Sequence, residues 1–354
     1  MSADFEQLLG QYDYAFPPEA VAQKPAEPRD SARLLVCSRD NDERQYDVYR
    51  NIGKYLPAGT VLVMNETKVV PARLEVVKPT GGTARVLFVG EKSGDFSMLK
   101  MYLVMSDRKL VVGSIVRIAQ NNTRSFLVQG QEDKYYVLVP EFSDATVDDV
   151  LERYGTMPLP PYINEHGMKE SELRARYQTV FARERGSVAA PTASLHFTPE
   201  ILASLRAQGV IIEYFTLHVG LGTFAPLTEE HVSNGVLHHE KYVIDVETAK
   251  RINEYKIVGR KIVAVGTTVV RTLESAANEE GFLTRLTGET GLFIREGYSF
   301  RVIDGLITNF HVPKSSLLML VSAFVGRERV LSMYLDGIAK GYRLFSFGDG
   351  MLIL

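Results

Sequence analysis

The sequence predicts an α/β protein in which a layered main domain is interrupted by a small β-barrel domain. From Gly186 onward, segments typical of strands and of helices alternate, whereas six short strand-like runs follow one another between Arg73 and about Pro140. The simplest arrangement is a discontinuous α/β domain of residues 1–66 and 151–354, with a barrel inserted as residues 67–150. The proline-rich segment Met157–Ile163 would lead the chain back into the main domain.

The predicted barrel rests on the spacing of its strand-like runs, which are RLEVV, RVLFV, MLKMYLV, SIVRIA, SFLVQ and KYYVLV. Turn-forming glycines and asparagines separate the runs, and no helix-length periodic pattern occurs among them. Short runs at this spacing are typical of a small barrel or sandwich.

The α/β prediction rests on helix signals between strand-like runs. Thr198 and Pro199 are typical of the start of a helix, which would end at Gly209 and be followed by a strand over Val210–Val219. The order then continues as YVIDV (strand), ETAKRINEYK (helix), KIVAV (strand) and VVRTLESAAN (helix). The helix expected after Ser316 is apolar on all sides, which predicts that it is buried.

The composition limits the possible classes of protein. The chain has 354 residues, of which 45% are hydrophobic and 23% charged, as in ordinary globular proteins. The single cysteine, Cys37, excludes a disulfide framework and a cysteine-based zinc module. With no signal-peptide pattern at the start and no apolar run near the roughly 20 residues of a membrane span, we expect a cytoplasmic protein. A net charge of −3 means that any RNA contact must use a local basic patch.

The segment HVGLGTFA contains two glycines, Gly220 and Gly222, after a strand. A dinucleotide-binding turn would continue directly into a helix, but Pro226 and a polar run follow here. Two interpretations remain: a glycine loop whose backbone approaches a ligand closely, or an ordinary tight turn.

Two further strand-to-helix junctions are candidate anion sites. At the first, Thr267 and Thr268 begin a helix and Arg271 follows, which suits a carboxylate or a phosphate. At the second, His311 follows a strand and Lys314 precedes a helix start, where open α/β sheets bind ligands. The alternatives are a threonine cap with Arg271 in a surface ion pair, and a loop histidine bonded to the backbone.

Two other histidine-containing segments have weaker signals. Small residues precede His196 in GSVAAPTASLHFT, so this segment either lies close to a flat ligand or is a tightly packed strand. The segment Leu237–Glu240 has two adjacent histidines, whose side chains would point to opposite faces of a strand. Because a further ligand at a suitable spacing is missing, we predict no metal site.

The segment Lys169–Gly186 is a candidate for RNA contacts. Its cations Arg174, Arg176, Arg183 and Arg185 could bind phosphates, and Tyr177 or Phe181 could stack on a base. The alternative is a solvated helix face.

Taken together and in order, the motifs resemble one family, the S-adenosylmethionine:tRNA ribosyltransferase-isomerases of queuosine biosynthesis. The resemblance covers nearly the whole chain, from YDYAFPPEAVAQKPAEPRDSARLLV and VLVMNETKVVPARL through PLPPYI, RYQTVFA, GSVAAPTASLHFT, FTLHVGLGTF, GTTVVRTLES and LITNFHVPKSSLLMLVSAF to YRLFSFGDGMLI. Ser194, Lys68 and His239 depart from the residues usual in that family, and the barrel region lacks its common tryptophan.

The resemblance implies a reaction. The ribosyl moiety of S-adenosylmethionine would be transferred and isomerised onto 7-aminomethyl-7-deazaguanine at the wobble position of tRNAs with a GUN anticodon. Epoxyqueuosine-tRNA would form, with release of adenine and methionine. S-adenosylmethionine would be a substrate, without cofactor or metal, and the protein would be a monomer without a membrane partner. The rival functions are an S-adenosylmethionine-dependent tRNA methyltransferase and a non-catalytic RNA-binding protein.

For this chemistry the candidate proton-transfer residues are His196, His218 and His311, with Asp304 as a carboxylate candidate. The candidate substrate contacts are Arg271, Thr267, Thr268, Gly220, Gly222 and Lys314, together with Arg29 and Asp30 from EPRDSARLL. This assignment requires the segments PTASLHF, GLGTF, GTT and NFHVP to gather around one cleft.

Overall fold

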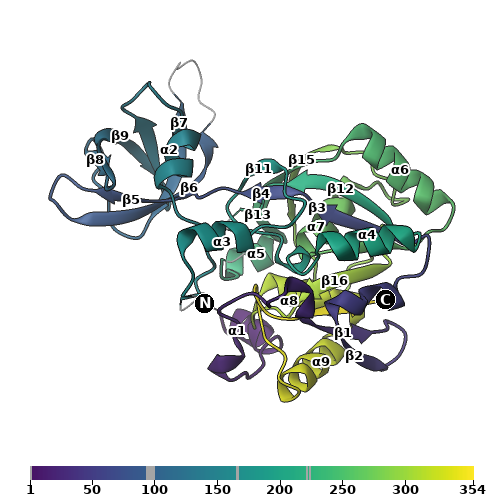
Figure 1. Ribbon diagram of the computed structural model, residues 1–354. Helices are drawn as coiled ribbons and strands as arrows, with labels where there is room; N and C mark the ends of the chain where they lie inside the picture. Colours follow the sequence, from purple (N-terminus) through teal and green to yellow (C-terminus); the bar gives the residue numbers. More distant parts are fainter. Residues whose placement is uncertain (1, 93–99, 165–166, 221, 223–224) are drawn as a thin grey trace.

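The computed structural model describes residues 2–92, 100–164, 167–220, 222 and 225–354. It has a large α/β body and a smaller β body, which lie side by side in Figure 1. The short strand β4 (Thr67–Val69) runs between them and pairs in parallel with β11 (Glu184–Ser187). Among the described residues, none of the helices has the length and apolar character of a transmembrane span.

The main sheet has nine strands in the order β15-β13-β12-β3-β14-β16-β17-β1-β2. Their bounds are β1 (Arg33–Cys37), β2 (Arg44–Val48), β3 (Val61–Asn65), β12 (Ile211–Leu217), β13 (Val236–Val243), β14 (Ile262–Val265), β15 (Thr287–Leu292), β16 (Gly305–Asn309) and β17 (Gly350–Ile353). The central strands β12, β3, β14 and β16 are parallel to their neighbours within this group, so their carboxyl ends meet at one edge of the sheet.

Helices cover both faces of this sheet, which confirms the mixed α/β fold. They are α1 (Ala3–Gly10), α3 (Glu170–Arg176), α4 (Pro199–Ala207), α5 (Glu229–Asn234), α6 (Val246–Ile257), α7 (Thr267–Ala276), α8 (Ser316–Val325) and α9 (Arg327–Ala339), with short 3-10 turns at Pro18–Ala20, Arg29–Ser31, Tyr49–Tyr55 and Thr192–Ser194. Side chains alternate along the strands between the two faces. In β16, for example, Leu306 packs with α7 and α8, whereas Ile307 packs with α4.

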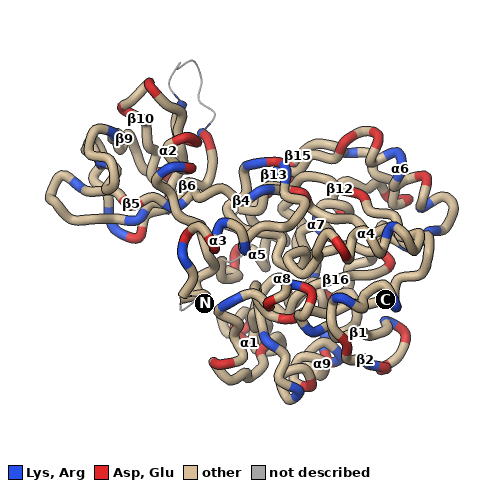
Figure 2. The backbone as a smooth tube through the Cα atoms, viewed as in Figure 1, with Lys and Arg blue, Asp and Glu red and all other residues tan. Residues whose placement is uncertain are grey.

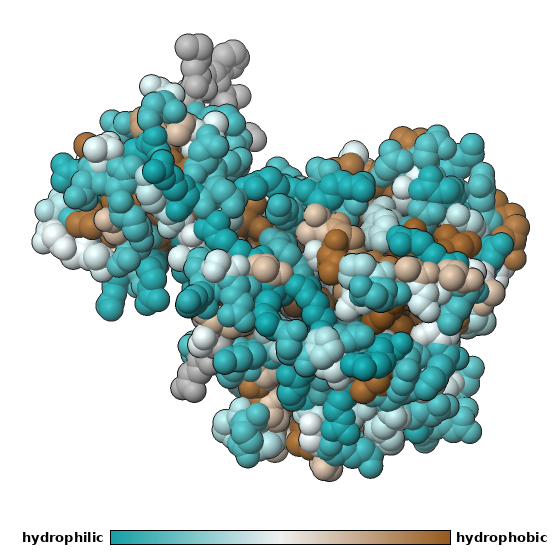
Figure 3. Space-filling view, viewed as in Figure 1, coloured by the Kyte–Doolittle hydropathy of each residue, from teal (hydrophilic) through white to brown (hydrophobic). Residues whose placement is uncertain are grey.

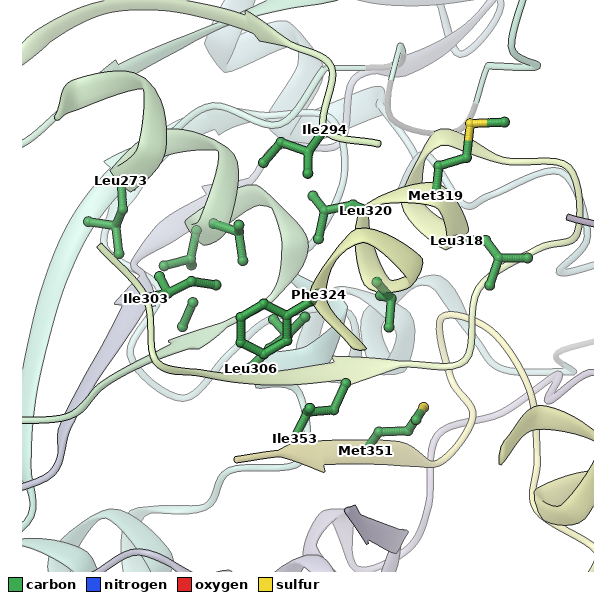
Figure 4. Close-up of a cluster of buried hydrophobic side chains, with 14 of the residues drawn as sticks. Leu273, Ile294, Ile303, Leu306, Leu318, Met319, Leu320, Phe324, Met351 and Ile353 are labelled. Carbon is green, nitrogen blue, oxygen red and sulfur yellow. The ribbon is translucent and has the colours of Figure 1, made fainter. Parts of the chain in front are cut away.

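The larger core lies between the sheet and helices α7 and α8. Figure 4 shows Leu273 of α7 and Leu320 and Phe324 of α8 above Leu306 and Ile353 of the sheet. Seven of the ten residues of α8 are buried, as its uniformly apolar sequence predicts. Helix α7 follows β14 and helix α8 follows β16, so both helices begin near the carboxyl edge of the sheet.

Local signals explain most of the helix starts. The Thr198 side chain caps α4 by accepting from the Ile201 amide, and the Ser315 side chain caps α8 by accepting from the Leu318 amide. One strand prediction was correct only in part: of YVIDV, Tyr242 and Val243 belong to β13, which ends at Val243. The Asp245 side chain instead caps α6. The competing cap explains the earlier strand end.

Each of the six strand-like runs overlaps one of six antiparallel strands that close into a barrel in the order β10-β7-β6-β5-β8-β9. Met98 and Leu99 of the run MLKMYLV lie outside the described residues. Their bounds are β5 (Arg73–Val77), β6 (Thr83–Lys92), β7 (Met101–Ser106), β8 (Ile115–Ile118), β9 (Asn121–Glu132) and β10 (Tyr135–Pro140), and helix α2 (Val147–Tyr154) packs on the barrel core. The surface shown in Figure 3 is mostly hydrophilic, with hydrophobic side chains in small separate patches.

Candidate functional site

A cavity of about 510 Å³ lies at the edge where the carboxyl ends of β14 and β16 meet. This volume is in the range of roughly 300–1,000 Å³ typical of small-molecule sites. Its walls come from distant parts of the chain: Glu6 and Leu9, Pro161–Tyr162, Ala190–Ala193, Val219, Ala225–Leu227, Gly266–Thr268, Thr308–Leu317 and Phe345–Ser346.

The cavity brings together the segments that the sequence marked as a possible cleft. The PTASLHF segment contributes Pro191, the GTT segment contributes Gly266–Thr268, and the NFHVP segment contributes Asn309–Pro313. The glycine loop is represented by the residues on either side of it, Val219 and Ala225. Leu221, Thr223 and Phe224 of that loop lie outside the described residues.

Two helices begin at this cavity. Gly266, Thr267 and Thr268 form the first turn of α7, and the carbonyl of Gly266 accepts from the amides of Val269 and Val270. The residues Ser315–Leu317 begin α8 in the same wall. Backbone N–H groups and the positive dipole end of a helix favour an anionic group, so the cavity is suited to a ligand with a carboxylate or a phosphate.

His311 lines the cavity and is anchored through both its backbone and its ring. Its amide donates to the Tyr334 hydroxyl at 2.9 Å, and its carbonyl accepts from the Tyr14 hydroxyl at 2.5 Å. The ring Nε2 lies 2.8 Å from Thr308 Oγ1. Burial lowers the pKa of His311 to about 3, so the imidazole is neutral at physiological pH.

His196 lies behind the cavity wall rather than in it. Its ring stacks on Tyr49 at a centroid distance of 4.2 Å, and Nε2 lies 3.4 Å from Nδ2 of Asn309. Asn309 lines the cavity and also accepts from the Thr192 hydroxyl at 2.8 Å. Burial lowers the pKa of His196 to about 3, so a neutral imidazole supports Asn309 from behind.

His218 is the third histidine candidate, and it too lies outside the cavity lining. Its Nδ1 is 3.2 Å from the hydroxyl of Thr67, which is 2.7 Å from the hydroxyl of Ser187. The Ser187 hydroxyl also accepts from the Val219 amide at 2.8 Å. Burial lowers the pKa of His218. Hydrogen bonds through the hydroxyls of Thr67 and Ser187 thus link His218 to the amide of Val219 in the cavity wall.

Comparison with known proteins decides the family. The family described as "Queuosine biosynthesis protein" matches residues 9–353. The chain belongs to this family.

Individual relatives agree over almost their full length. The S-adenosylmethionine:tRNA ribosyltransferase-isomerases of Halothermothrix orenii and Carboxydothermus hydrogenoformans are each 46% identical; the matches cover 97% and 98% of this chain and 99% of each relative. The crystal structure of the S-adenosylmethionine tRNA ribosyltransferase from Thermotoga maritima is 32% identical and superposes with a TM-score of 0.54, covering 97% of this chain and 100% of that one.

In this member of the queuosine biosynthesis protein family, Arg271 does not point into the cavity as the sequence suggested. Its side chain is 4% exposed and pairs with Glu240 at 2.6 Å. Its other donors contact the carbonyls of Leu292 and Thr290 at 3.1 and 3.2 Å. The prediction that Arg271 contacts a carboxylate of the substrate is therefore corrected. The helical turn before Arg271 lines the cavity, but the guanidinium binds Glu240 and backbone carbonyls.

Asp304 is also corrected, because it precedes β16 and thus lies at the opposite end of that strand from His311. Its carboxylate accepts from the Ile262 amide at 2.9 Å and pairs with Lys261 at 3.2 Å. These contacts join the starts of two neighbouring strands, so Asp304 has a structural role far from the cavity.

The remaining substrate candidates are divided. Lys314 lines the cavity, with its ammonium 2.9 Å from a carboxylate oxygen of Asp13. Arg29 donates to the carbonyls of Gln178 and Ala175, which ties it to the end of α3. Asp30 pairs with the exposed Arg50 at 3.5 Å. Arg29 and Asp30 are therefore outside the cavity lining, as are Gly220 and Gly222.

The predicted RNA contacts separate into engaged and accessible side chains. Arg174 binds Glu152 at 3.0 Å and Glu170 at 3.1 Å, and Arg176 pairs with Glu172 at 3.0 Å and also with Glu27. Tyr177 is 0% exposed, so it cannot stack on a base, and this prediction is wrong. Arg183 and Arg185 also form ion pairs, with Glu66 at 3.5 Å and with Glu152 at 2.8 Å, but their side chains are 75% and 45% exposed. Figure 2 shows basic and acidic residues intermingled rather than separated into one basic face.

Several cavity residues escaped the sequence analysis. Tyr162 and Ser346 line the cavity and share a hydrogen bond of 2.6 Å. Both belong to segments that carry the family resemblance, PLPPYI and YRLFSFGDGMLI, but neither has a residue type that marks catalysis. Phe345 also lines the cavity without having been singled out, and it is one of the three non-glycine residues with positive φ in the described structure. Such backbone strain is invisible in a sequence.

The described residues contain no cluster of three or more histidine, cysteine, aspartate or glutamate side chains that could hold a metal ion. The segment Leu237–Glu240 lies within β13, at an irregularity in the pairing of β13 with β15.

Proposed function

We propose that this chain transfers and isomerises the ribosyl moiety of S-adenosylmethionine onto 7-aminomethyl-7-deazaguanine at the wobble position of tRNA. The products would be epoxyqueuosine-tRNA, adenine and methionine. One observation carries the proposal: a cavity at the carboxyl edge of the sheet is lined by residues from six of the segments by which the chain resembles the family. S-adenosylmethionine would be consumed as a substrate, without a further cofactor.

The walls of the cavity match the chemistry of that substrate. The carboxylate of its methionine part would lie at the first turn of α7 or of α8, where backbone N–H groups point outward. Apolar side chains in the lining, among them Leu9, Leu227 and Phe345, would pack against the adenine ring. The cavity would thus hold a flat apolar group and an anionic group at once.

His311 is the proposed proton-transfer residue, because it is the one of the three candidate histidines that lines the cavity, whereas His196 and His218 are not part of the lining. The sulfonium makes the neighbouring C5′ hydrogens acidic, so loss of one of them would start the elimination that expels adenine. The aminomethyl nitrogen of the RNA base would then attack the rearranged sugar and lose a proton, and methionine would leave as the C5′–S bond breaks and the epoxide closes. A phosphate or carboxylate bound close to His311 would raise its pKa from about 3 towards the range useful for proton transfer.

The RNA would approach past the junction of the two bodies, where Arg183 and Arg185 are exposed. The barrel, proposed as an inserted domain of residues 67–150, is joined to the cavity wall through β4 and β11. Binding of a GUN anticodon, a monomeric state and a cytoplasmic location belong to this proposal as well. The guanidinium groups of Arg183 and Arg185 would neutralise phosphates on either side of the extruded base.

The test is product analysis with purified chain, S-adenosylmethionine and tRNA that carries 7-aminomethyl-7-deazaguanine. We expect adenine and methionine in equal amounts, and neither product with tRNA that carries guanine. Formation of S-adenosylhomocysteine would show a methyltransferase instead. Binding of tRNA with S-adenosylmethionine left intact would show a non-catalytic RNA-binding protein.

A further inference from the structure

A buried ion pair lies behind the cavity, between Arg271 of α7 and Glu240 of β13. Each residue is 4% exposed, and the charged atoms are 2.6 Å apart. Two charges removed from water lose much of their hydration, and their attraction seldom exceeds that loss by a large margin. Stability alone is therefore a weak reason for such a pair, and its contacts indicate what else it does.

The remaining donors of Arg271 fix its orientation. Nε donates to the carbonyl of Leu292 at 3.1 Å, and Nη2 lies 3.2 Å from the carbonyl of Thr290 and 3.5 Å from that of His238. These carbonyls belong to the neighbouring strands β13 and β15. The guanidinium is thus held from three sides and presents Nη1 to the carboxylate in one direction.

Glu240 connects Arg271 to the backbone next to the cavity wall. While Oε2 accepts from Arg271, Oε1 accepts from the amide of Gly220 at 3.0 Å. Gly220 directly follows Val219, which lines the cavity. The amide of Val219 is itself held by the Ser187 hydroxyl at 2.8 Å. Two consecutive amides at the start of the glycine loop are therefore fixed by side chains.

The other residue of the pair, Arg271, lies on α7, whose first turn also lines the cavity. Thr267 of the cavity lining is four residues before Arg271 in α7, one helical turn away on the same face. The ion pair therefore links the start of the glycine loop to the first turn of α7, and both of these elements line the cavity.

We propose that Glu240 and Arg271 are positioning residues that set the distance between Val219 and the first turn of α7, and thereby the shape of the site for S-adenosylmethionine. This inference rests on the proposed function. Neither side chain touches the substrate; the pair acts through the Gly220 amide and through α7. Loss of the pair should weaken binding of S-adenosylmethionine even when tRNA is absent.

The experiment compares Glu240→Gln, Arg271→Lys and the double variant with the wild-type chain. Equilibrium dialysis gives the Kd for S-adenosylmethionine without tRNA, steady-state kinetics give KM and kcat, and thermal unfolding gives Tm. We expect each single variant to raise the Kd roughly tenfold, because small displacements of binding groups weaken a preorganised site strongly. The double variant should be scarcely worse than either single one, since both remove the same link.

The matched control is Glu213→Gln, which breaks another glutamate–arginine pair of the main sheet. Glu213 is 6% exposed and binds Arg251 at 2.7 and 2.8 Å, on β12 and α6, and it does not line the cavity. This variant should lower Tm without changing the Kd for S-adenosylmethionine.

The inference is overturned if the Glu240 and Arg271 variants keep the wild-type Kd while losing Tm as the control does. Fully additive effects in the double variant would also overturn it. If Glu240→Gln does not fold, Arg271→Lys decides alone, because it retains the charge but not the fork of donors. A wild-type chain that neither binds S-adenosylmethionine nor releases adenine refutes the proposed function instead.

Discussion

The cavity edge of the sheet and the basic segment Lys169–Gly186 were both candidate functional regions, but the structure treats them differently. At the cavity edge, segments separated by more than a hundred residues in the chain meet in one wall. In the basic segment, neighbouring side chains are used within the protein: Arg174 and Arg176 bind carboxylates, and Tyr177 is completely buried.

This difference shows that the order of strands is a better guide to a functional site than the types of side chain in one segment. Parallel strands place their carboxyl ends together whatever their side chains are, so a residue after such a strand reaches a predictable place. The direction of a side chain on a short helix depends on its partners. Arg174 finds carboxylates on α2 and on its own helix, which no local pattern announces. The order of strands and helices therefore predicted which segments meet at the cavity, whereas the composition of Lys169–Gly186 did not predict which of its side chains are exposed.

The largest expected effect is at the cavity edge. His311→Ala should lower kcat/KM for adenine release about 10²-fold or more, the range associated with loss of a proton-transfer group. His239→Ala, at an exposed histidine outside the cavity, is the matched control and should retain wild-type kinetics. Equal rates for both variants would remove His311 from the proton-transfer assignment.

The next effect concerns the basic segment and should appear in stability rather than in RNA binding. Tyr177→Ala removes a fully buried ring that packs against Phe347, and should cost about 3–5 kcal/mol of unfolding free energy. Tyr177→Phe keeps the ring and should bind tRNA like the wild type, as measured by filter binding. A loss of tRNA affinity in the Phe variant, with unchanged stability, would contradict the buried role of this residue.

A third expectation concerns pH and distinguishes the buried histidines from exposed ones. Burial lowers the folded-state pKa of His311 to about 3, below the usual value of 6.5. Between these values the unfolded chain binds a proton that the folded chain does not, so stability is lost as pH falls. His311→Asn should reduce the slope of unfolding free energy by about 1.4 kcal/mol per pH unit between about pH 6 and 5.

The same denaturation series on His239→Asn serves as the comparison for this pH effect. His239 is exposed and lies outside the cavity, so its replacement controls for the loss of a histidine as such. Identical slopes for the wild type and both variants would mean that His311 titrates normally in the folded protein.

The smallest expected effect is on the salt dependence of tRNA binding, and it distinguishes the exposed Arg183 from the more covered Arg174. If Arg183 contacts a phosphate, Arg183→Ala should reduce the slope of log Kd for tRNA against log salt by about 1. Arg174→Ala should change that slope little, because Arg174 is bound to two carboxylates and two backbone carbonyls. The reverse result would mean that tRNA binding rearranges α3, and the comparison between the two regions would fail.

The sequence by itself determined the local elements and the places where they begin. Thr198 and Pro199 start α4 as predicted, the apolar run after Ser316 is a buried helix, and each strand-like run of the smaller body overlaps one of its described strands. These features depend on capping groups, hydrophobic periodicity and turn residues that lie close together in the chain. The ordered motifs were sufficient to identify the family.

Only the tertiary structure decided which side chains reach the cavity. Arg271 and Asp304 have suitable chemistry, yet Glu240 holds the first inside the protein and β16 places the second at the opposite edge. Tyr162 and Ser346 reach the cavity from segments without a catalytic signature. The physical reason is that a side chain's direction depends on partners distant in sequence, whose positions are set when strands pair and layers pack.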